Sequence, residues 1–577
     1  MRNIFRFQYL IYILIVLFSL SWHEANAQLV TDSPKRETRA VWLTTVKGLD
    51  WPRHKVRGKA DIALQKQELT DVLDKLKAAN INVVVMQVRT RGTVIYPSSI
   101  ETWDECLTGK IGTNPGYDPL AFAVDECHKR GMELHAWVVA IPLGKVSRMR
   151  QAGAKSLLVN KPSVCKAAGQ ELFHIPGNPE TAEYIASLCR EIASNYDVDG
   201  ISLDYIRYPE AVYKFSDDNL YSKSSGQTRA EWKRANIDRI VRRVSEEVKS
   251  IKPWIWLSSS PVGKYGDLKR YPSGGWNCYT GVYQDPKLWL REGWQDMLMP
   301  MMYFRGNNFY PFLCDWAETS GGKPVAAGLG IYFLDPREGN WRLNDVRQEL
   351  YAVRFTNPGG VAFFRSDFLV SDHQGIYKTV KNEFFRYKAL TPRMSWGIDT
   401  LAPGVPRNLH VENRVLSWDP VKDNSTDVKY VVYGWYDKHR DVERAQTEVA
   451  SSIIEVRVDD CKFSLPDATL KYNMFAVTAV DRFGNESEPA VLSADVTCAN
   501  LPGVYSALPM LFADEYGNVA VEKMKKDNGI VVRNSTGAIV KKMSSVRRFN
   551  VSGLKRGEYR IDISGKKVMR SYRLIVD

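Results

Sequence analysis

The sequence predicts a (β/α)8 barrel followed by two small all-β domains, and three observations support this. From residue 35 to residue 392, apolar residues alternate between strand-like spacing and helical spacing. The strand-like runs are short and rich in β-branched residues, which is typical of parallel strands that are buried on both faces. After Pro403 the helical spacing stops, and short strand-like runs follow one another closely.

Eight strands and the helices between them make up the predicted barrel. The expected strands are Thr38–Thr45, Ile81–Val88, Met132–Val139, Asp199–Asp204, Trp254–Ser259, Asp296–Tyr303, Pro324–Ile331 and Gly360–Arg365. The expected helices are Leu64–Ala79, Pro119–Arg130, Thr181–Tyr196, Glu231–Ile251, Pro286–Gly293, Leu343–Phe355 and Gln374–Tyr387. A doubly wound open sheet is the alternative. Such a sheet more often has a glycine-rich phosphate-binding turn after its first strand, and residues 44–50 do not form one.

Residues 403–497 and 500–577 are expected to form the two all-β domains. The first resembles a fibronectin type III β-sandwich in the runs Leu416–Pro420, Tyr430–Tyr433 and Tyr472–Asp481. Modules of that kind mostly serve as spacers or docking platforms. The second resembles the small C-terminal sorting domains of Bacteroidetes secretion systems in the runs Val531–Val540, Phe549–Tyr559 and Tyr572–Val576. A second plain β-sandwich fits that pattern nearly as well.

Residues 1–27 are predicted to be a signal peptide. Arg2 and Arg6 are basic, Tyr9–Leu20 is apolar, and Ala25–Ala27 is a small-x-small cleavage site. A membrane anchor that is not cleaved is the alternative, for which the apolar run is short. No later run is apolar and long enough to cross a bilayer. We therefore expect an exported protein, in the periplasm or at the cell surface or outside the cell, with no membrane segment after cleavage.

Composition narrows the classes of partner. The net charge is +13, but the basic residues are scattered and form neither a block nor a known nucleic-acid motif. In an exported protein, such a surface favours contact with anionic envelope polymers. None of the eight cysteines forms a Cys-x-x-Cys pair, so no structural zinc site is expected, and we expect no other metal or cofactor. The sequence does not indicate an oligomeric state.

The strongest signal for chemistry lies where the fourth strand ends. Asp204 is the last residue of that strand, and barrels place their active sites at the carboxyl ends of strands. Asp199 begins the same strand and is expected to be structural. Two rings and a cation follow Asp204 directly: Tyr205, Arg207 and Tyr208. Rings cover the apolar faces of sugars, and a carboxylate can meet the charge that develops at an anomeric carbon, which favours Asp204 as nucleophile or base of a glycosidase.

A glycosidase needs a second carboxyl group, and three candidates present themselves. Glu101 is the first choice as general acid, because Trp103 beside it would raise its pKa by removing water. The alternative for Glu101 is a salt bridge within its loop. Asp367, just past the eighth strand, is the second choice, and Glu210 is the third.

Other candidates for substrate binding are arginines and rings near the strands. Guanidinium groups bind carboxylates through two parallel hydrogen bonds, although they also brace loops. The arginines that follow strand ends are Arg89, Arg91, Arg207 and Arg365, of which Arg89, Arg207 and Arg365 are the candidates for the site. The ring candidates, for which core packing is the alternative, are Trp42, Trp103, Trp137, Tyr205, Tyr208 and Tyr303. His135 lies in mid-strand and is expected to line the pocket and orient a carboxylate rather than bind a metal.

Short motifs are spread over the predicted barrel. They include Arg39–Val46, Asp50–Pro52, Gln87–Arg89, Gly116–Leu120, His128–Gly131, His135–Trp137 and Asp199–Pro209. Together, over roughly residues 35–390, they resemble the glycosyl hydrolase-like 10 family. The resemblance implies a (β/α)8 glycoside hydrolase. It also implies a glycan substrate, because a characterised activity of the family cuts peptidoglycan strands that have lost their stem peptides.

On that substrate the arginines would meet an anion, since muramic acid keeps its lactyl carboxylate when the peptide is removed. Two alternatives stay open. One is a hydrolase of a dietary or host polysaccharide on the same fold. The other is a non-catalytic envelope protein that binds a glycan, because a fold alone does not establish a function.

Overall fold

The structure is a computed structural model that describes residues 33–223, 226–273, 275–423, 426–494, 510–511, 513, 517–520, 529–534, 538–544, 548–564 and 569–576. The predicted signal peptide lies outside these residues. The chain divides into two compact units, one built mainly of residues up to Leu401 and the other mainly of residues from Ala402 onward.

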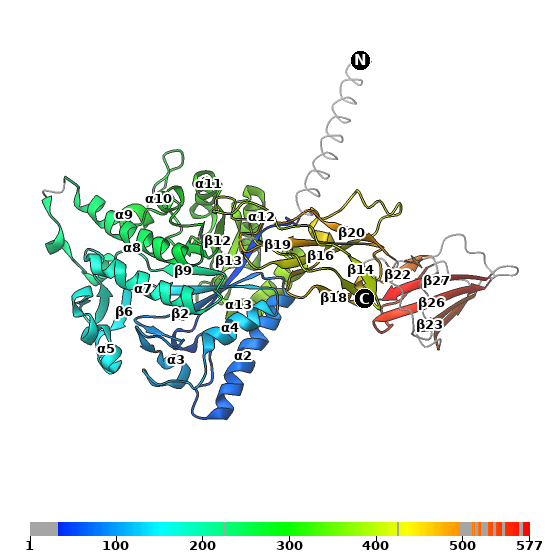
Figure 1. The fold of residues 1–577 in the computed structure, drawn as a ribbon, viewed down its shortest axis with the longest axis horizontal. Coiled ribbons are helices and arrows are strands. Elements are labelled where there is room, and N and C mark those ends of the chain that lie inside the picture. Colours follow the sequence, from blue (N-terminus) through cyan, green and yellow to red (C-terminus); the bar gives the residue numbers. More distant parts are fainter. Residues whose placement is uncertain are drawn as a thin grey trace, which may run out of the picture. The chain divides into compact units, whose positions relative to one another are not determined.

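Eight parallel strands close into a barrel in the first unit, and Figure 1 labels several of them together with helices around them. They are β1 (Thr38–Leu43), β2 (Val83–Arg89), β5 (Glu133–Val139), β9 (Gly200–Asp204), β10 (Trp256–Ser259), β11 (Met297–Leu298), β12 (Val325–Leu329) and β13 (Gly359–Phe363). The hydrogen-bonded order is β1-β13-β12-β11-β10-β9-β5-β2, and β2 pairs with β1 to complete the ring. The predicted barrel is therefore confirmed, because an open sheet would leave two edges unpaired.

Helices surround the strands, and three of them differ from the prediction. The helices are α2 (Lys59–Ala78), α4 (Pro119–His128), α7 (Pro179–Asn195), α8 (Arg229–Ile251), α10 (Pro286–Arg291), α11 (Tyr310–Thr319), α12 (Leu343–Thr356), α13 (Ser366–Val370) and α14 (Ile376–Thr379). Helices α11 and α13 were not predicted, although the buried residues Phe312, Leu313 and Trp316 of α11 have helical spacing. The predicted final helix is broken, because Gly375 adopts a left-handed backbone and α14 passes into a π-turn at Val380–Phe384.

Among these described helices, none combines the length and the hydropathy that a membrane span requires.

Alternate residues of the strands serve two separate cores. On β1, Val41 and Leu43 join the apolar cluster that includes the helices, whereas Trp42 belongs to a second cluster of strand residues inside the barrel. Trp137 on β5 belongs to the inner cluster as well. Side chains alternate between the two faces of a strand. Inward-facing residues at the carboxyl ends of the strands therefore lie at that end of the barrel, which we call the mouth.

Three polar side chains brace the amino ends of strands by the same contact. Asn82 accepts a hydrogen bond from the amide of Arg39 at 2.8 Å, and Asp199 accepts one from the amide of Leu134 at 2.9 Å. Asp296 accepts one from the amide of Leu257 at 2.9 Å. Asp199 is buried at the end of the barrel opposite to Asp204, as predicted from its place in the strand.

An insertion that the sequence did not reveal follows β5. It contains a three-stranded antiparallel sheet made of β6 (Pro142–Lys145), β7 (Cys165–Ala168) and β8 (Glu171–His174), with β8 in the middle. Helix α5 (Val146–Gln151) lies in the same segment, and Leu143, Met149 and Leu172 contribute to a small core of its own. Because the segment starts at the carboxyl end of β5, it enlarges the barrel mouth.

The second unit is all-β in its described residues. Its first part has two antiparallel sheets, with orders β14-β15-β18 and β17-β16-β19-β20, around a shared apolar core. Their strands are β14 (His410–Glu412), β15 (Val415–Ser417), β16 (Lys429–Trp435), β17 (Ile453–Val458), β18 (Lys462–Ser464), β19 (Met474–Val480) and β20 (Ala490–Ser493). The last part has sheets of order β21-β27-β26-β23-β24 and β22-β25. Its strands are β21 (Met510–Leu511), β22 (Asn518–Ala520), β23 (Gly529–Asn534), β24 (Ile539–Ser544), β25 (Arg548–Asn550), β26 (Gly557–Ser564) and β27 (Met569–Val576).

Candidate active site

Asp204 lies at the carboxyl end of β9 with only 5% of its surface exposed. The indole N–H of Trp137 donates to its Oδ2 at 3.0 Å, and the amide of Tyr205 donates to its Oδ1 at 2.7 Å. Both oxygens are thus acceptors, which suits the ionised carboxylate. Burial raises the pKa of Asp204, and the nearby charge of Arg207 works in the opposite direction. The two hydrogen bonds that Asp204 accepts favour its ionised form, which a nucleophile or a base needs.

Arg207 stands next to Asp204 and has a side chain that is only partly satisfied. Its guanidinium lies over the ring of Tyr205, 4.2 Å from the centroid, and 5.7 Å from the ring centroid of Trp276. Nη2 donates to Glu210 Oε1 at 3.0 Å. Nε and Nη1 are buried and have no hydrogen-bond partner among the described residues. A cation with two unsatisfied donors therefore lies beside the buried carboxylate.

Rings from four strand ends form the inner wall of the mouth. Phe364, directly after β13, is their common contact. Its ring centroid lies 6.0 Å from Trp42, 6.5 Å from Trp137, 5.5 Å from Tyr303 and 5.8 Å from Tyr332. Trp42 and Trp137 are almost fully buried, so they form a packed floor rather than the open platforms expected of them.

Three rings at the mouth were missed by sequence reasoning. Tyr332 and Phe364 follow β12 and β13, and their places just past strand ends were the available signal. Trp276 follows β10 after a longer loop and is 48% exposed. Its exposure leaves it open to stack on a sugar, and its contact with Arg207 places it near Asp204.

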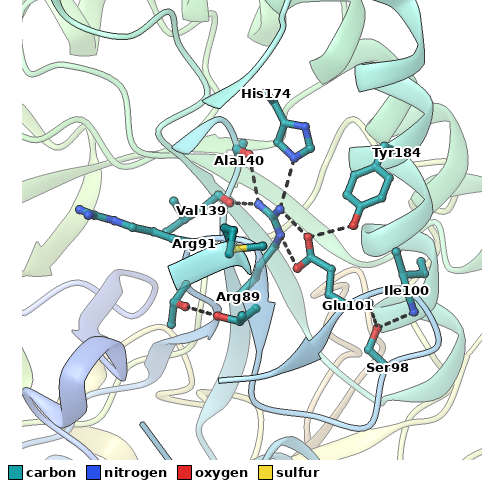
Figure 2. Close-up of polar contacts among 12 residues, drawn as sticks. Arg89, Arg91, Ser98, Ile100, Glu101, Val139, Ala140, His174 and Tyr184 are labelled. Atoms are coloured by element: carbon teal, nitrogen blue, oxygen red, sulfur yellow. Dashed lines mark hydrogen bonds and ion pairs between the residues drawn. The ribbon is translucent and has the colours of Figure 1, made fainter. Parts of the chain in front are cut away.

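Glu101 does not have the position expected of a general acid. It lies just before β4 (Thr102–Trp103) and is 1% exposed. Arg89 donates to it from Nε at 2.8 Å and from Nη2 at 2.6 Å, and the hydroxyl of Tyr184 donates at 3.0 Å (Figure 2). This is the salt bridge that was the alternative for Glu101. Its partner lies twelve residues away across a turn, which sequence spacing does not reveal.

Arg89 was expected to bind the substrate, but its guanidinium is also hydrogen-bonded to other residues of the protein. Besides Glu101, its Nη1 donates to the carbonyl oxygens of Val139 and Ala140, the second at 3.1 Å. Its Nη2 lies 3.3 Å from Nε2 of His174. A guanidinium has five N–H donors, and all five have acceptors here. We therefore no longer expect Arg89 to bind the glycan.

Arg365 and Asp367 brace the loops after β13 and β1. Arg365 forms an ion pair with Asp50, and Thr44 Oγ1 also donates to Asp50 at 2.6 Å. Burial raises the pKa of Asp50, which the charge of Arg365 opposes. Arg365 is thus a bracing residue rather than the expected ligand of the glycan. Asp367 pairs with the exposed Arg53 and keeps 26% of its side chain exposed.

Three further expectations differ from the structure. Tyr208 is buried, and its hydroxyl donates to Asp217 and accepts from Asn236, both at 3.0 Å, so it anchors the loop instead of stacking on sugar. His135 is fully buried and lies 3.2 Å from Glu133 at the amino end of β5, away from the mouth. Trp103 is half-buried against the core that includes the helices.

The structure thus brings together Asp204, Tyr205, Arg207, Glu210 and Trp276, with Trp137 and Tyr303 behind them. Glu210 was the third choice for the second carboxyl group, and its ion pair with Arg207 now places it near Asp204. Its side chain is 30% exposed. Glu210 and Asp367 are accordingly the two remaining candidates.

Comparison with known proteins identifies the family of the chain. The family model described as "Glycosyl hydrolase-like 10" matches residues 37–325, a range that contains Asp204 and its neighbours. "Glycosyl hydrolase YngK" of Bacillus subtilis (strain 168) is 29% identical over 498 residues, covering 80% of this chain and 93% of that protein. "Glycosyl hydrolase DigH" of Escherichia coli (strain K12) is 32% identical over 373 residues, covering 59% of this chain and 85% of that protein.

Among solved structures, the PgaB (BpsB) glycoside hydrolase domain from Bordetella bronchiseptica is 11% identical and covers 61% of this chain and 99% of that one. Its TM-score is 0.40, and we infer nothing from a likeness at that level. The family model and the two sequence relatives are sufficient without it. The chain belongs to the glycosyl hydrolase-like 10 family, and it is a glycoside hydrolase.

Proposed function

We propose that the protein is exported and cuts a cell-envelope glycan, and that peptidoglycan strands without stem peptides are its substrate. The observation that carries the proposal is Arg207. Its side chain is 4% exposed, it adjoins Asp204, and two of its nitrogens have no partner among the described residues. A buried donor without an acceptor costs free energy, so such donors in a cleft indicate a ligand that supplies the acceptors.

A sugar that carries a carboxylate fits this arrangement. Muramic acid keeps its lactyl carboxylate after the peptide is removed, and a buried guanidinium with unsatisfied N–H donors can form a charge-assisted hydrogen bond with that carboxylate. Trp276 would cover the apolar face of a neighbouring pyranose. The net charge of +13 would attract an anionic polymer over longer distances.

Asp204 is the proposed nucleophile or base, and the proton donor is Glu210 or Asp367. Two carboxyl groups about 5–5.5 Å apart retain the anomeric configuration, and groups about 6.5–9.5 Å apart invert it. Glu210→Gln and Asp367→Asn separate the two candidates. The variant that lacks the acid should lose most of its rate on natural glycans but little on aryl glycosides, whose leaving groups need no proton.

The substrate is tested with three glycans that differ in one group. Peptide-free peptidoglycan strands are compared with the same strands after reduction of the lactyl carboxyl to an alcohol, and with chitin oligosaccharides, which lack the lactyl group. Products are weighed by mass spectrometry. We expect the native strands to be cut with a kcat/KM about 10-fold to 100-fold above the other two, as loss of a charged hydrogen bond predicts. Equal rates on all three would contradict the proposal.

Variants of two arginines connect that preference to the site. Arg207→Met should lose the preference for the carboxylate, and Arg207→Lys should keep part of it. Arg91→Met is the matched control, because Arg91 is an exposed cation whose charge also acts on Asp204. If Arg91→Met loses the preference to the same extent as Arg207→Met, general attraction rather than a specific contact explains it.

A dietary or host polysaccharide is the second candidate substrate. The exposed indole of Trp276 is compatible with such a substrate, because rings stack on neutral sugars as well as on charged ones. Hydrolysis of an uncharged polysaccharide in a panel, with no cutting of peptidoglycan strands, would select this candidate.

Export and the role of the second unit are part of the proposal. The predicted signal peptide supports export, and a mature protein that begins at Gln28 in the periplasmic or external fraction would test it by mass spectrometry. The two antiparallel sheets of residues 410–493 support a fibronectin type III-like spacer or docking module. The strands after residue 510 would then form the sorting-type domain or a second sandwich.

A further inference from the structure

The Arg89–Glu101 pair is buried at the carboxyl end of the barrel, yet it takes no part in the chemistry proposed above. The exposed fractions of the two side chains are 1% and 0%. Burying two opposite charges gains little stability over an apolar pair of the same size. Stability alone therefore does not explain why a buried ion pair lies close to the reactive carboxylate of Asp204.

The guanidinium of Arg89 holds several segments together. Figure 2 shows it at the centre of contacts from Glu101 before β4, His174 at the end of β8, and the end of β5. Tyr184 of α7 adds a hydrogen bond to Glu101. The insertion, the loop after β2 and the barrel thus share one polar centre.

The charges of this centre are mutually consistent. Burial alone would lower the pKa of Arg89, but Glu101 raises it above the ordinary value, so Arg89 stays charged. Burial lowers the pKa of His174 far below its usual value, and the charge of Arg89 acts in the same direction. A neutral His174 has a ring nitrogen that can accept the hydrogen bond from Arg89.

The contacts of Arg89 on β5 lead directly to Asp204. Val139, whose carbonyl oxygen accepts from Arg89, is the register partner of Asp204. Ala140 accepts from Arg89 through its carbonyl oxygen and donates its amide to the carbonyl oxygen of Asp204 at 2.8 Å. Trp137, two residues before Val139 on β5, donates to the carboxylate itself. The end of β5 is therefore held by Arg89 on one side and holds Asp204 on the other.

We propose that Arg89 and Glu101 are positioning residues, which fix the end of β5 and thereby the place of the Asp204 carboxylate. This inference rests on Asp204 as the reacting carboxylate, which is part of the proposed function. Arg89 supplies the hydrogen bonds to β5, and Glu101 holds Arg89 charged and in place.

The first test separates positioning from stability. Arg89→Met leaves Glu101 as an unpaired buried charge, whereas the double variant Arg89→Met/Glu101→Leu removes both charges. We expect the double variant to recover most of the Tm that the single variant loses. Its kcat on glycan strands should nevertheless stay about 100-fold below that of the wild type, because a misplaced carboxylate reacts slowly, while KM changes by less than about threefold. A kcat that returns together with Tm would overturn the proposal.

A matched control exists at the other end of the same barrel. Arg39 and Glu37 form a buried ion pair at 2.8 Å, near the amino end of β1 and far from the mouth. Arg39→Met/Glu37→Leu should affect Tm in a comparable way and leave kcat within about threefold of the wild type. A comparable loss of kcat in this control would show that any disturbed pair slows the enzyme, and would also overturn the proposal.

The second test uses a variant that keeps the shape of the site and so is expected to fold. Glu101→Gln retains an oxygen that accepts from Arg89, and Arg89 keeps its contacts to β5. We expect kcat to fall by about tenfold or less, with both limbs of the pH profile retained. A fall of about 1000-fold with loss of the alkaline limb would instead make Glu101 the general acid.

Failure of the inference and failure of the proposed function have different signatures. If wild-type protein does not cut peptide-free strands, the proposed substrate is wrong, and the variants are measured on the glycan or aryl glycoside that the wild type does hydrolyse. If Asp204→Asn is fully active on that substrate, the assumed role of Asp204 is wrong. The positioning proposal fails by itself when Asp204→Asn is inactive and one of three results is found: a fully active Arg89→Met/Glu101→Leu variant, a comparable loss of kcat in the Arg39→Met/Glu37→Leu control, or loss of the alkaline limb in Glu101→Gln.

Discussion

Two buried carboxylates at the mouth of the barrel each adjoin an arginine, and their surroundings differ in one respect. Glu101 and Arg89 satisfy each other, with two hydrogen bonds between them and every remaining N–H of Arg89 bound to the chain. Asp204 and Arg207 lie close but form no such pair, and two nitrogens of Arg207 have no partner among the described residues.

The difference separates a structural pair from a reactive one. A carboxylate that is saturated by a bidentate guanidinium can neither attack a sugar nor move a proton, because its oxygens are occupied. A carboxylate that lies near an arginine without a bidentate contact is stabilised by the positive charge and keeps its reactivity. Four substitutions test this reading, from the largest expected effect to the smallest.

Asp204→Asn should have the largest effect. We expect kcat to fall on the order of 10⁴-fold or more, because the reacting oxygen is lost. Tm at neutral pH should stay within about 4 °C of the wild type, as the side chains have the same shape. Turnover is followed by the release of reducing ends. A tenfold change in rate corresponds to about 1.4 kcal/mol of activation free energy. If Asp204→Asn kept an activity within tenfold of the wild type, Asp204 would have no essential role in the mechanism.

The same variant has a pH signature in stability. Burial raises the folded-state pKa of Asp204 above its ordinary value of 3.8, so ionisation is less favourable in the folded protein than in the unfolded one. Stability that depends on Asp204 is therefore fully present below pH 3.8 and falls as the pH rises through the folded pKa. Asparagine does not ionise, so Tm of Asp204→Asn relative to the wild type should increase between acidic and neutral pH. A constant difference would contradict this.

Arg89→Met should have the second largest effect, and on stability. It leaves Glu101 buried and unpaired, which costs about 3–5 kcal/mol of unfolding free energy. Arg207→Met is the comparison, because its partner Glu210 is partly exposed and can be solvated. Denaturant unfolding monitored by fluorescence measures both. Equal losses for the two variants would remove the distinction between the pairs.

Arg207→Met should show the third effect, on the pH profile. Arg207 lowers the pKa of Asp204, so its removal leaves burial unopposed and raises that pKa further. Because Asp204 is proposed to act when ionised, the acidic limb of kcat/KM should move to higher pH. Arg207→Lys keeps the charge and should leave the limb close to its original position. An unmoved limb in Arg207→Met would show that Arg207 does not act on Asp204.

Trp276→Ala should have the smallest effect. An exposed ring that stacks on a sugar contributes about 0.5–1.5 kcal/mol, so KM for glycan strands should rise roughly threefold to tenfold with little change in kcat. Tm should not change, because the ring is half exposed. Val159→Ala removes an exposed apolar side chain from the insertion and serves as control. Unchanged KM would remove Trp276 from the binding surface.

Periodicity along the chain was enough to predict the barrel. Apolar residues have one spacing in the strands and another in the helices, and each spacing can be recognised from neighbours within a few residues. The final residue of β9 follows from the same pattern, so Asp204 could be placed at the mouth from sequence. Asp199 could be placed at the opposite end for the same reason.

The state of each polar group depended on contacts between distant residues. Glu101 meets Arg89 across a turn, and His174 approaches the same guanidinium from 85 residues away. Trp276 reaches Arg207 from the loop after another strand. The sequence by itself therefore determined the barrel and the end at which Asp204 stands. Only the tertiary structure decided which charges are saturated, because hydrogen-bond partners are chosen by proximity in space and not by spacing along the chain.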